Sequence, residues 1–96
     1  MNIDVIKNEN DITIKLVGRL DTNTSPALDK CINEEVKGVM NLTVDLGGVE
    51  YVSSAGLRVL LSAQKKFNNG LKIKNVQESV MEVFDITGFC DILNIE

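Results

Sequence analysis

The sequence has no histidine and no tryptophan, and only one proline and two cysteines among its 96 residues. Without histidine, Ser-His-Asp and Cys-His triads, histidine phosphocarriers and histidine zinc sites are all excluded. Cys31 and Cys90 form neither a CxxC pair nor a metal-binding spacing, which predicts two reduced and mostly buried thiols. One proline and seven glycines also argue against a disordered or fibrous chain. We therefore expect a folded protein without a metal site.

Positive charge is also scarce, because 10 basic residues stand against 14 acidic ones and the formal net charge is −4. Nucleic acids and anionic membranes bind cationic surfaces, so this balance argues against both as partners. The apolar runs are too short to cross a membrane, and the first eleven residues lack the apolar stretch of a signal peptide. We expect a single domain over residues 1–96, located in the cytoplasm.

Apolar periodicity and turn residues predict four strands. The first two are joined by the polar turn 8–11, so they are expected to form a hairpin. The third is followed by a tail, residues 47–52, that is expected to turn toward a helix. The predicted strands are residues 2–6, 12–17, 42–46 and 71–74.

Three apolar stripes with helical spacing follow the second, third and fourth strands. The first helix is expected to have Thr24 or Ser25 as its N-cap and to stop at Gly38. The second ends at the turn 68–70, and the third ends at Gly88. The stripes are Ala27, Leu28, Cys31, Ile32 and Val36 in the first helix, Gly56, Leu60, Ala63 and Phe67 in the second, and Val80, Val83, Phe84 and Ile86 in the third.

The resulting order, β-β-α-β-α-β-α, predicts an α/β protein. Each strand-helix-strand passage should be a right-handed crossover, which makes the connected strands parallel. The opening hairpin adds one antiparallel strand. We therefore expect a mixed sheet with parallel central strands and helices packed on it.

Two serines stand where the third strand leads into the second helix. Ser53 and Ser54 occupy the N-cap region, and the small residues Ala55 and Gly56 leave a hydroxyl there accessible. Free N–H groups and the helix dipole would favour an anion at this place. One interpretation is an ordinary helix cap. The other is a phosphorylation site, where a phosphate would add roughly −1.5 to −2 charges.

The segment Tyr51–Leu61, YVSSAGLRVLL, resembles the signature of STAS domains, specifically of bacterial anti-sigma factor antagonists. Gly18–Asp21, GRLD, resembles the Gly-x-Leu-Asp element that follows the second strand in that family. Chain length, spacing and element order agree over essentially the whole chain. The resemblance implies a STAS-like fold and a binding protein that is not an enzyme and has no cofactor of its own.

The resemblance also implies a partner switch. The unphosphorylated antagonist binds an anti-sigma factor that is also a serine kinase, and the sigma factor is released. The kinase, which binds ATP, phosphorylates the antagonist and ends binding, and a PP2C-type phosphatase removes the phosphate. The family's acceptor serine lies two residues before the glycine, which is Ser54 here. Many members have Asp before the acceptor, whereas this chain has Ser53, a second candidate acceptor.

Further residues are expected around Ser54 on the partner-binding surface. The matching motif implies that Asp21 lines this surface, although its carboxylate could instead cap loop N–H groups. Arg58 lies four residues after Ser54 and shares its helical face, where it would contact a partner or a phosphate, or remain solvated. The expected partner-binding residues are Asp21, Thr22, Asn23, Ser53, Ser54, Ala55, Gly56 and Arg58.

Two other functions stay open at this point. A STAS module that is never phosphorylated would serve as an interaction subunit of a transport or stress-signalling complex, and Ser53 in place of Asp favours it. A small serine hydrolase with a Ser-Lys dyad is opposed by the nearest downstream lysine, Lys65, which is far from Ser54 in sequence.

Overall fold

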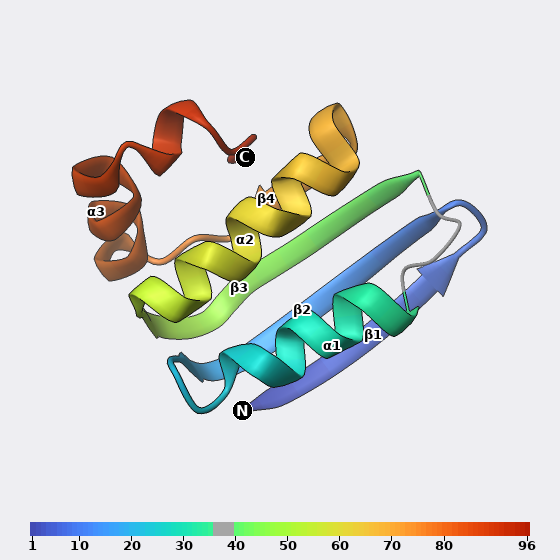
Figure 1. Cartoon of the computed structure of the whole chain (residues 1–96), viewed down its shortest axis with the longest axis horizontal. Coiled ribbons are helices and arrows are strands. Elements are labelled where there is room, and N and C mark those ends of the chain that lie inside the picture. Colours follow the sequence, from blue (N-terminus) through green and yellow to red (C-terminus); the bar gives the residue numbers. More distant parts are fainter. Residues whose placement is uncertain (36–39) are drawn as a thin grey trace.

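A four-stranded sheet lies at the centre of the computed structural model, which describes residues 1–35 and 40–96 (Figure 1). Its strands are β1 (Asn2–Asn8), β2 (Asp11–Leu20), β3 (Asn41–Val52) and β4 (Leu71–Lys74), and they lie in the order β1-β2-β3-β4. β1 pairs antiparallel with β2, whereas β2 with β3 and β3 with β4 are parallel. The expected mixed sheet is confirmed, with the hairpin strand at one edge.

The helices are α1 (Ser25–Glu35), α2 (Ser54–Phe67) and α3 (Glu78–Thr87), with short 3₁₀ turns at Asn68–Gly70 and Phe89–Asp91. α1 and α2 lie side by side on one face of the sheet, and α3 packs against β3 near one end (Figure 1). α2 ends at the expected turn, and Gly88 closes α3 in a left-handed conformation. The expected end of the first helix, Val36 and Gly38, lies outside the described residues.

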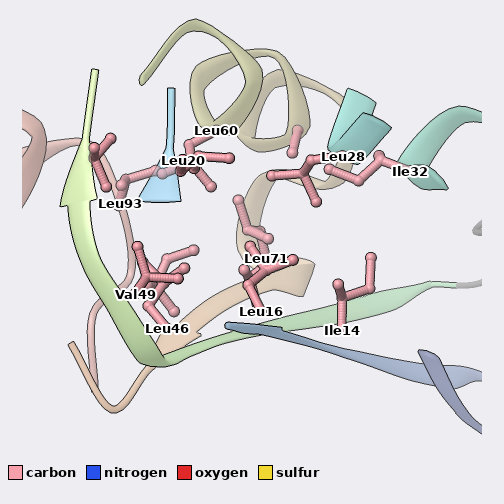
Figure 2. Packing of buried hydrophobic residues seen from close by; sticks show 14 of the residues in the cluster. Ile14, Leu16, Leu20, Leu28, Ile32, Leu46, Val49, Leu60, Leu71 and Leu93 are labelled. Atoms are coloured by element: carbon pink, nitrogen blue, oxygen red, sulfur yellow. The ribbon is translucent and has the colours of Figure 1, made fainter. Parts of the chain in front are cut away.

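The core forms between the sheet and the helices α1 and α2, and α3 adds Val80 and Phe84 to it. Along β2, Ile12, Ile14 and Leu16 are buried, and the residues between them face away from the helices. Figure 2 shows side chains from the strands meeting Leu28 of α1 and Leu60 of α2 in one apolar layer. Burial of this apolar surface stabilises the fold by roughly 25 cal/mol for each Å² removed from water.

β3 is longer than the sequence analysis predicted, because residues 47–52 continue the strand instead of leaving it. The register between β2 and β3 shifts twice over this stretch. Two glycines permit the distortion. A Cβ on Gly48 would lie 2.8 Å from Val17 Cγ2 and 2.9 Å from the Leu16 carbonyl oxygen, and Gly18 has a φ of +121°. The irregular strand carries the chain directly to the two serines.

The start of α3 is tied to this distorted half of β3. The Gln77 side-chain amide donates a hydrogen bond to the carbonyl oxygen of Gly47, at 2.7 Å. The Ser79 hydroxyl donates to the carbonyl oxygen of Glu50, at 3.0 Å. These bonds satisfy main-chain acceptors that a regular partner strand would otherwise occupy.

Two features of the C-terminal third differ from the prediction. Ile86 does not belong to the buried stripe of α3 and is 85% exposed, because it lies about 200° around the helix from the fully buried Phe84. The chain end was not expected to join the sheet. Ile95 forms a parallel bridge with Ile73, supported by hydrogen bonds of 2.9 Å and 2.8 Å on either side. Among the described residues, no helix is both long enough and apolar enough to cross a membrane.

The contrast between Phe84 and Ile86 can be tested by unfolding. Phe84→Ala should lower the free energy of unfolding by about 3–5 kcal/mol, because it leaves a cavity between α3 and the sheet. The matched control Ile86→Ala, on the same helix, should change it by less than about 0.5 kcal/mol. Urea titrations followed by circular dichroism measure both. Similar losses for the two variants would contradict this packing of α3.

Candidate functional site

Two loops meet at the carboxyl ends of β2 and β3. The Ser53 backbone N–H donates to the Leu20 carbonyl oxygen at 2.8 Å, which joins the two strand ends. Gly56 lies directly against Leu20, since a Cβ there would be 2.7 Å from Leu20 Cγ and 3.0 Å from its carbonyl oxygen. The missing side chain therefore lets the first turn of α2 approach the end of β2. The loop after Leu20, which begins with Asp21, is thereby placed beside the two serines.

The two serines have different roles in this geometry. Ser53 is the N-cap of α2, and its hydroxyl oxygen accepts a hydrogen bond from the Gly56 N–H at 3.4 Å. Its side chain is half-buried. Ser54 is the first helical residue and is exposed, and its hydroxyl has no hydrogen-bond partner among the described residues. The cap interpretation therefore applies to Ser53, while the hydroxyl of Ser54 is open to solvent.

Asp21 organises the neighbouring loop. Its Oδ1 accepts hydrogen bonds from the backbone N–H groups of Asn23 at 2.9 Å and Thr24 at 3.0 Å. Thr24 Oγ1 donates to the Arg19 carbonyl oxygen at 2.6 Å and accepts from the Asp21 N–H at 2.9 Å. Asp21 thus caps loop N–H groups, as one of the two sequence interpretations held, and Thr22 and Asn23 are exposed at the tip.

These contacts determine the charge state of Asp21. The backbone N–H of Thr24 lowers the pKa of its carboxyl, and partial burial opposes this effect. The Asn23 N–H, the Thr24 hydroxyl and the positive charge of Arg19 lower it further. Asp21 is therefore an ionised carboxylate, and its Oδ1 is already engaged by its own loop.

Arg19 and Tyr51 form a second feature that the sequence analysis did not single out. The Arg19 guanidinium carbon lies 4.1 Å from the centroid of the Tyr51 ring, and the two residues are register partners on β2 and β3. Such a contact is a cation–π interaction. It could not be found from spacing, because the two register shifts decide which residues face each other.

The remaining expected site residues fall into two groups. Arg58 is exposed on the outer face of α2, one turn beyond Ser54, as its spacing predicted. Ala55 is half-buried, and Gly56 is buried. Gly56 therefore shapes the surface through its contact with Leu20 and is buried in the unbound chain, while its expected place among the partner-binding residues stays a prediction.

The arrangement does not favour catalysis by Lys65. That lysine lies 11 residues beyond Ser54 on the same helix, which corresponds to about 16 Å along the axis. Two cavities, of about 490 Å³ and 400 Å³, lie elsewhere, one between β1 and α1 and one on the sheet face opposite the helices. Neither is lined by Ser53 or Ser54. The site is an open surface, and such a surface suits contact with another protein.

Comparison with known proteins gives one consistent result. The family model for the STAS domain matches residues 2–96. The anti-sigma-B factor antagonist of Bacillus subtilis (strain 168) is 35% identical over 98 residues, which cover 99% of this chain and 90% of the relative.

Solved structures agree with this result at the level of the fold. An anti-sigma factor antagonist from Mycobacterium paratuberculosis has a TM-score of 0.88 at 23% identity, covering 98% of this chain and 83% of the other. SpoIIAA in its unphosphorylated form has a TM-score of 0.83 at 16% identity, covering 99% and 88%. Its phosphorylated form has a TM-score of 0.71 at 14% identity, covering 99% and 91%. The expected α/β architecture is confirmed.

The hydrogen bonds of Asp21 lead to a pH-dependent prediction. Because the folded pKa lies below the unfolded one, ordinarily about 3.9, the carboxylate stabilises the loop fully above the unfolded pKa. This stabilisation should disappear as the pH falls through the folded pKa. Asp21→Asn should therefore be less stable than wild type at pH 7 and nearly equal near pH 2. NMR titration of the carboxyl carbon checks the direction, and titration at or above the ordinary value would refute it.

The division between the serines can also be tested by stability. Ser53→Ala should cost about 0.5–2 kcal/mol because the N–H of Gly56 loses its cap. Ser54→Ala should change stability by less than about 0.5 kcal/mol because its hydroxyl is exposed. Thermal unfolding of both variants at one pH measures the two losses of stability. Equal losses would show that Ser54 also contributes to the cap.

Proposed function

Since this chain belongs to the STAS domain family and to its anti-sigma factor antagonists, we propose that phosphorylation of Ser54 switches its partner binding off. Proteins of this kind are binding proteins rather than enzymes. In the proposal, the unphosphorylated chain binds an anti-sigma factor that is also a serine kinase, and the sigma factor is released. The kinase binds ATP and transfers its γ-phosphate to Ser54, which ends binding. A PP2C-type phosphatase removes the phosphate and restores the hydroxyl. All of these steps take place in the cytoplasm.

The exposed hydroxyl of Ser54 carries this proposal. It stands at the first position of α2 and has no hydrogen-bond partner among the described residues, so a kinase can reach it without unfolding the helix. Ser53 is the less favourable acceptor, since its oxygen caps the N–H of Gly56 and its side chain is half-buried. Modification of Ser53 would break the cap, whereas modification of Ser54 would not.

The position of Ser54 also supports an effect on the partner rather than on the fold. A phosphate adds roughly −1.5 to −2 charges at neutral pH. At the N-terminus of a helix, negative charge is stabilising by about 0.3–1 kcal/mol, so α2 should tolerate it. SpoIIAA, which has a similar fold, is described in both an unphosphorylated and a phosphorylated form. The added charge would then act on whatever protein covers this surface.

The proposed partner-binding surface combines the start of α2 with the loop between β2 and α1. Ser54 and Arg58 contribute from the helix, and Thr22 and Asn23 contribute from the loop tip. Asp21 contributes mainly by holding that tip in place through its two hydrogen bonds from the backbone N–H groups of Asn23 and Thr24. The bond between Ser53 and Leu20 fixes the two parts relative to each other.

A second candidate function is an interaction subunit that is never phosphorylated, in a transport or stress-signalling complex. The observation that favours it is Ser53, which stands where many members of the family have Asp before the acceptor. Under this alternative, Ser54 would carry no phosphate in cells and the partner would not bind ATP. The two experiments below distinguish the two functions.

Affinity capture identifies the partner. Wild type and Ser54→Asp, used as baits in lysate of the source cells, should differ in one ATP-binding protein that only wild type retains. Asn69→Asp is the matched control, because Asn69 is exposed just beyond the far end of α2 and is distant from Ser54 and Arg58. It should retain the partner. Equal capture by Ser54→Asp, or capture of transport subunits without a kinase, would contradict the proposed switch.

The acceptor is identified with the purified partner and ATP. Wild type and Ser53→Ala should incorporate one phosphate, located on Ser54 by mass spectrometry, and Ser54→Ala should incorporate none. Circular dichroism of each variant controls for folding. Phosphorylation of Ser54→Ala at the wild-type rate would place the acceptor elsewhere and overturn the role of Ser54.

A further inference from the structure

The distribution of arginine on the surface is uneven. The ten basic residues of the chain include only two arginines, Arg19 and Arg58. Arg58 lies one turn beyond Ser54 on the exposed face of α2. Arg19 directly precedes Leu20, the residue whose carbonyl oxygen binds the N–H of Ser53. Both arginines therefore belong to the end of the molecule where β2 finishes and α2 begins, with the side chain of Arg19 on the opposite face of the sheet from the buried Leu20.

The positive charge of both arginines remains largely uncompensated. None of the four ion pairs among the described residues involves Arg58. Arg19 reaches Asp21 only at the limit of an ion pair, with its Nε 4.0 Å from Oδ2. The other oxygen of that carboxylate is occupied by Asn23 and Thr24. An Arg with an unoccupied guanidinium edge can still bind an additional carboxylate.

Arg19 is also held in place. Its guanidinium stacks on the ring of Tyr51, whose side chain is itself partly exposed. Stacking limits the conformations that an exposed arginine must give up when it binds, which lowers the entropic cost of contact. Arginine and tyrosine, together with tryptophan, are enriched at the energetic centres of protein interfaces. The Arg19–Tyr51 pair is therefore preorganised for contact with another protein.

The proposed direction of the switch adds a second constraint on the partner. If the partner presented cations to this surface, a phosphate on Ser54 would attract it and strengthen binding. A phosphate weakens binding when the partner presents carboxylates, because like charges that meet at an interface are strongly unfavourable. An acidic partner surface fits both the arginines of the unmodified chain and the loss of binding on phosphorylation.

We propose that Arg19 and Arg58 bind carboxylates of the anti-sigma factor, so that an acidic patch of the partner covers the end of the molecule that carries Ser54. This inference rests on the proposed function and specifies the chemistry of its partner. Phosphorylation then changes the charge of the surface, because the phosphate neutralises Arg58, one turn away on α2, and repels the carboxylates of the partner.

The experiment measures the affinity of the purified anti-sigma factor for a set of variants by surface plasmon resonance. Arg58→Glu combined with Arg19→Gln should weaken binding at least tenfold, mainly through slower association at low salt. Arg58→Lys, which keeps the charge, should stay within about threefold of wild type. The matched control Lys65→Glu reverses a charge on the same helix, far from Ser54, and should bind like wild type.

Salt gives a second measurement of the same effect. Raising the salt concentration from about 50 to 300 mM should weaken the binding of wild type several-fold, whereas the double arginine variant should not weaken, because salt screens the repulsion between its new carboxylate at position 58 and the acidic partner. Circular dichroism confirms that each variant is folded. Wild-type or tighter affinity of the folded double variant would overturn the inference and leave the proposed function intact. Failure of wild type itself to bind any anti-sigma factor would instead overturn the proposed function, and this inference with it.

Discussion

The close approach of α2 to the end of β2 is the contact on which the rest of the site depends. Leu20 is central to it, since its side chain is fully buried in the core and its carbonyl oxygen accepts the N–H of Ser53. Gly56 makes the approach possible, because any side chain there would collide with Leu20. One residue thus links the hydrophobic core to the surface that carries Ser54. The geometry of that surface is determined by packing rather than by a flexible loop.

Because of this contact, the adjacent residues Ser53 and Ser54 have different roles. Ser53 is held by the main chain of β2 and caps the helix, whereas Ser54 projects into solvent. A charge added to Ser54 would meet the N-terminal end of the helix dipole and no buried group, so the fold would tolerate the proposed phosphorylation. The side chains of Gln77 and Ser79 donate hydrogen bonds to main-chain carbonyl oxygens of β3. These bonds fix the part of the strand that leads to the two serines.

Much of this could be predicted from the sequence, because local signals agreed with one another. Alternating residues in β2, Gly88 after α3 and the serines before α2 each predicted their element directly. The features that the sequence did not predict share a physical cause, because each depends on contacts between residues that are distant in sequence. The length of β3 follows from register shifts against β2, and Ile95 joins the sheet only because Ile73 has a free edge. The stacking of Arg19 on Tyr51 depends on the same register.

The bridge between Ile73 and Ile95 has a consequence for self-association. A sheet edge with free N–H and carbonyl groups is a template on which other chains can assemble in register, the first step toward fibrils. The last residues of the chain occupy that edge at β4, and Glu96 places a carboxylate within 3.8 Å of the amino groups of Lys72 and Lys74. The residues around Ile95 therefore cover part of the β4 edge and also pack against the core, so their removal would expose backbone groups of β4 together with apolar side chains.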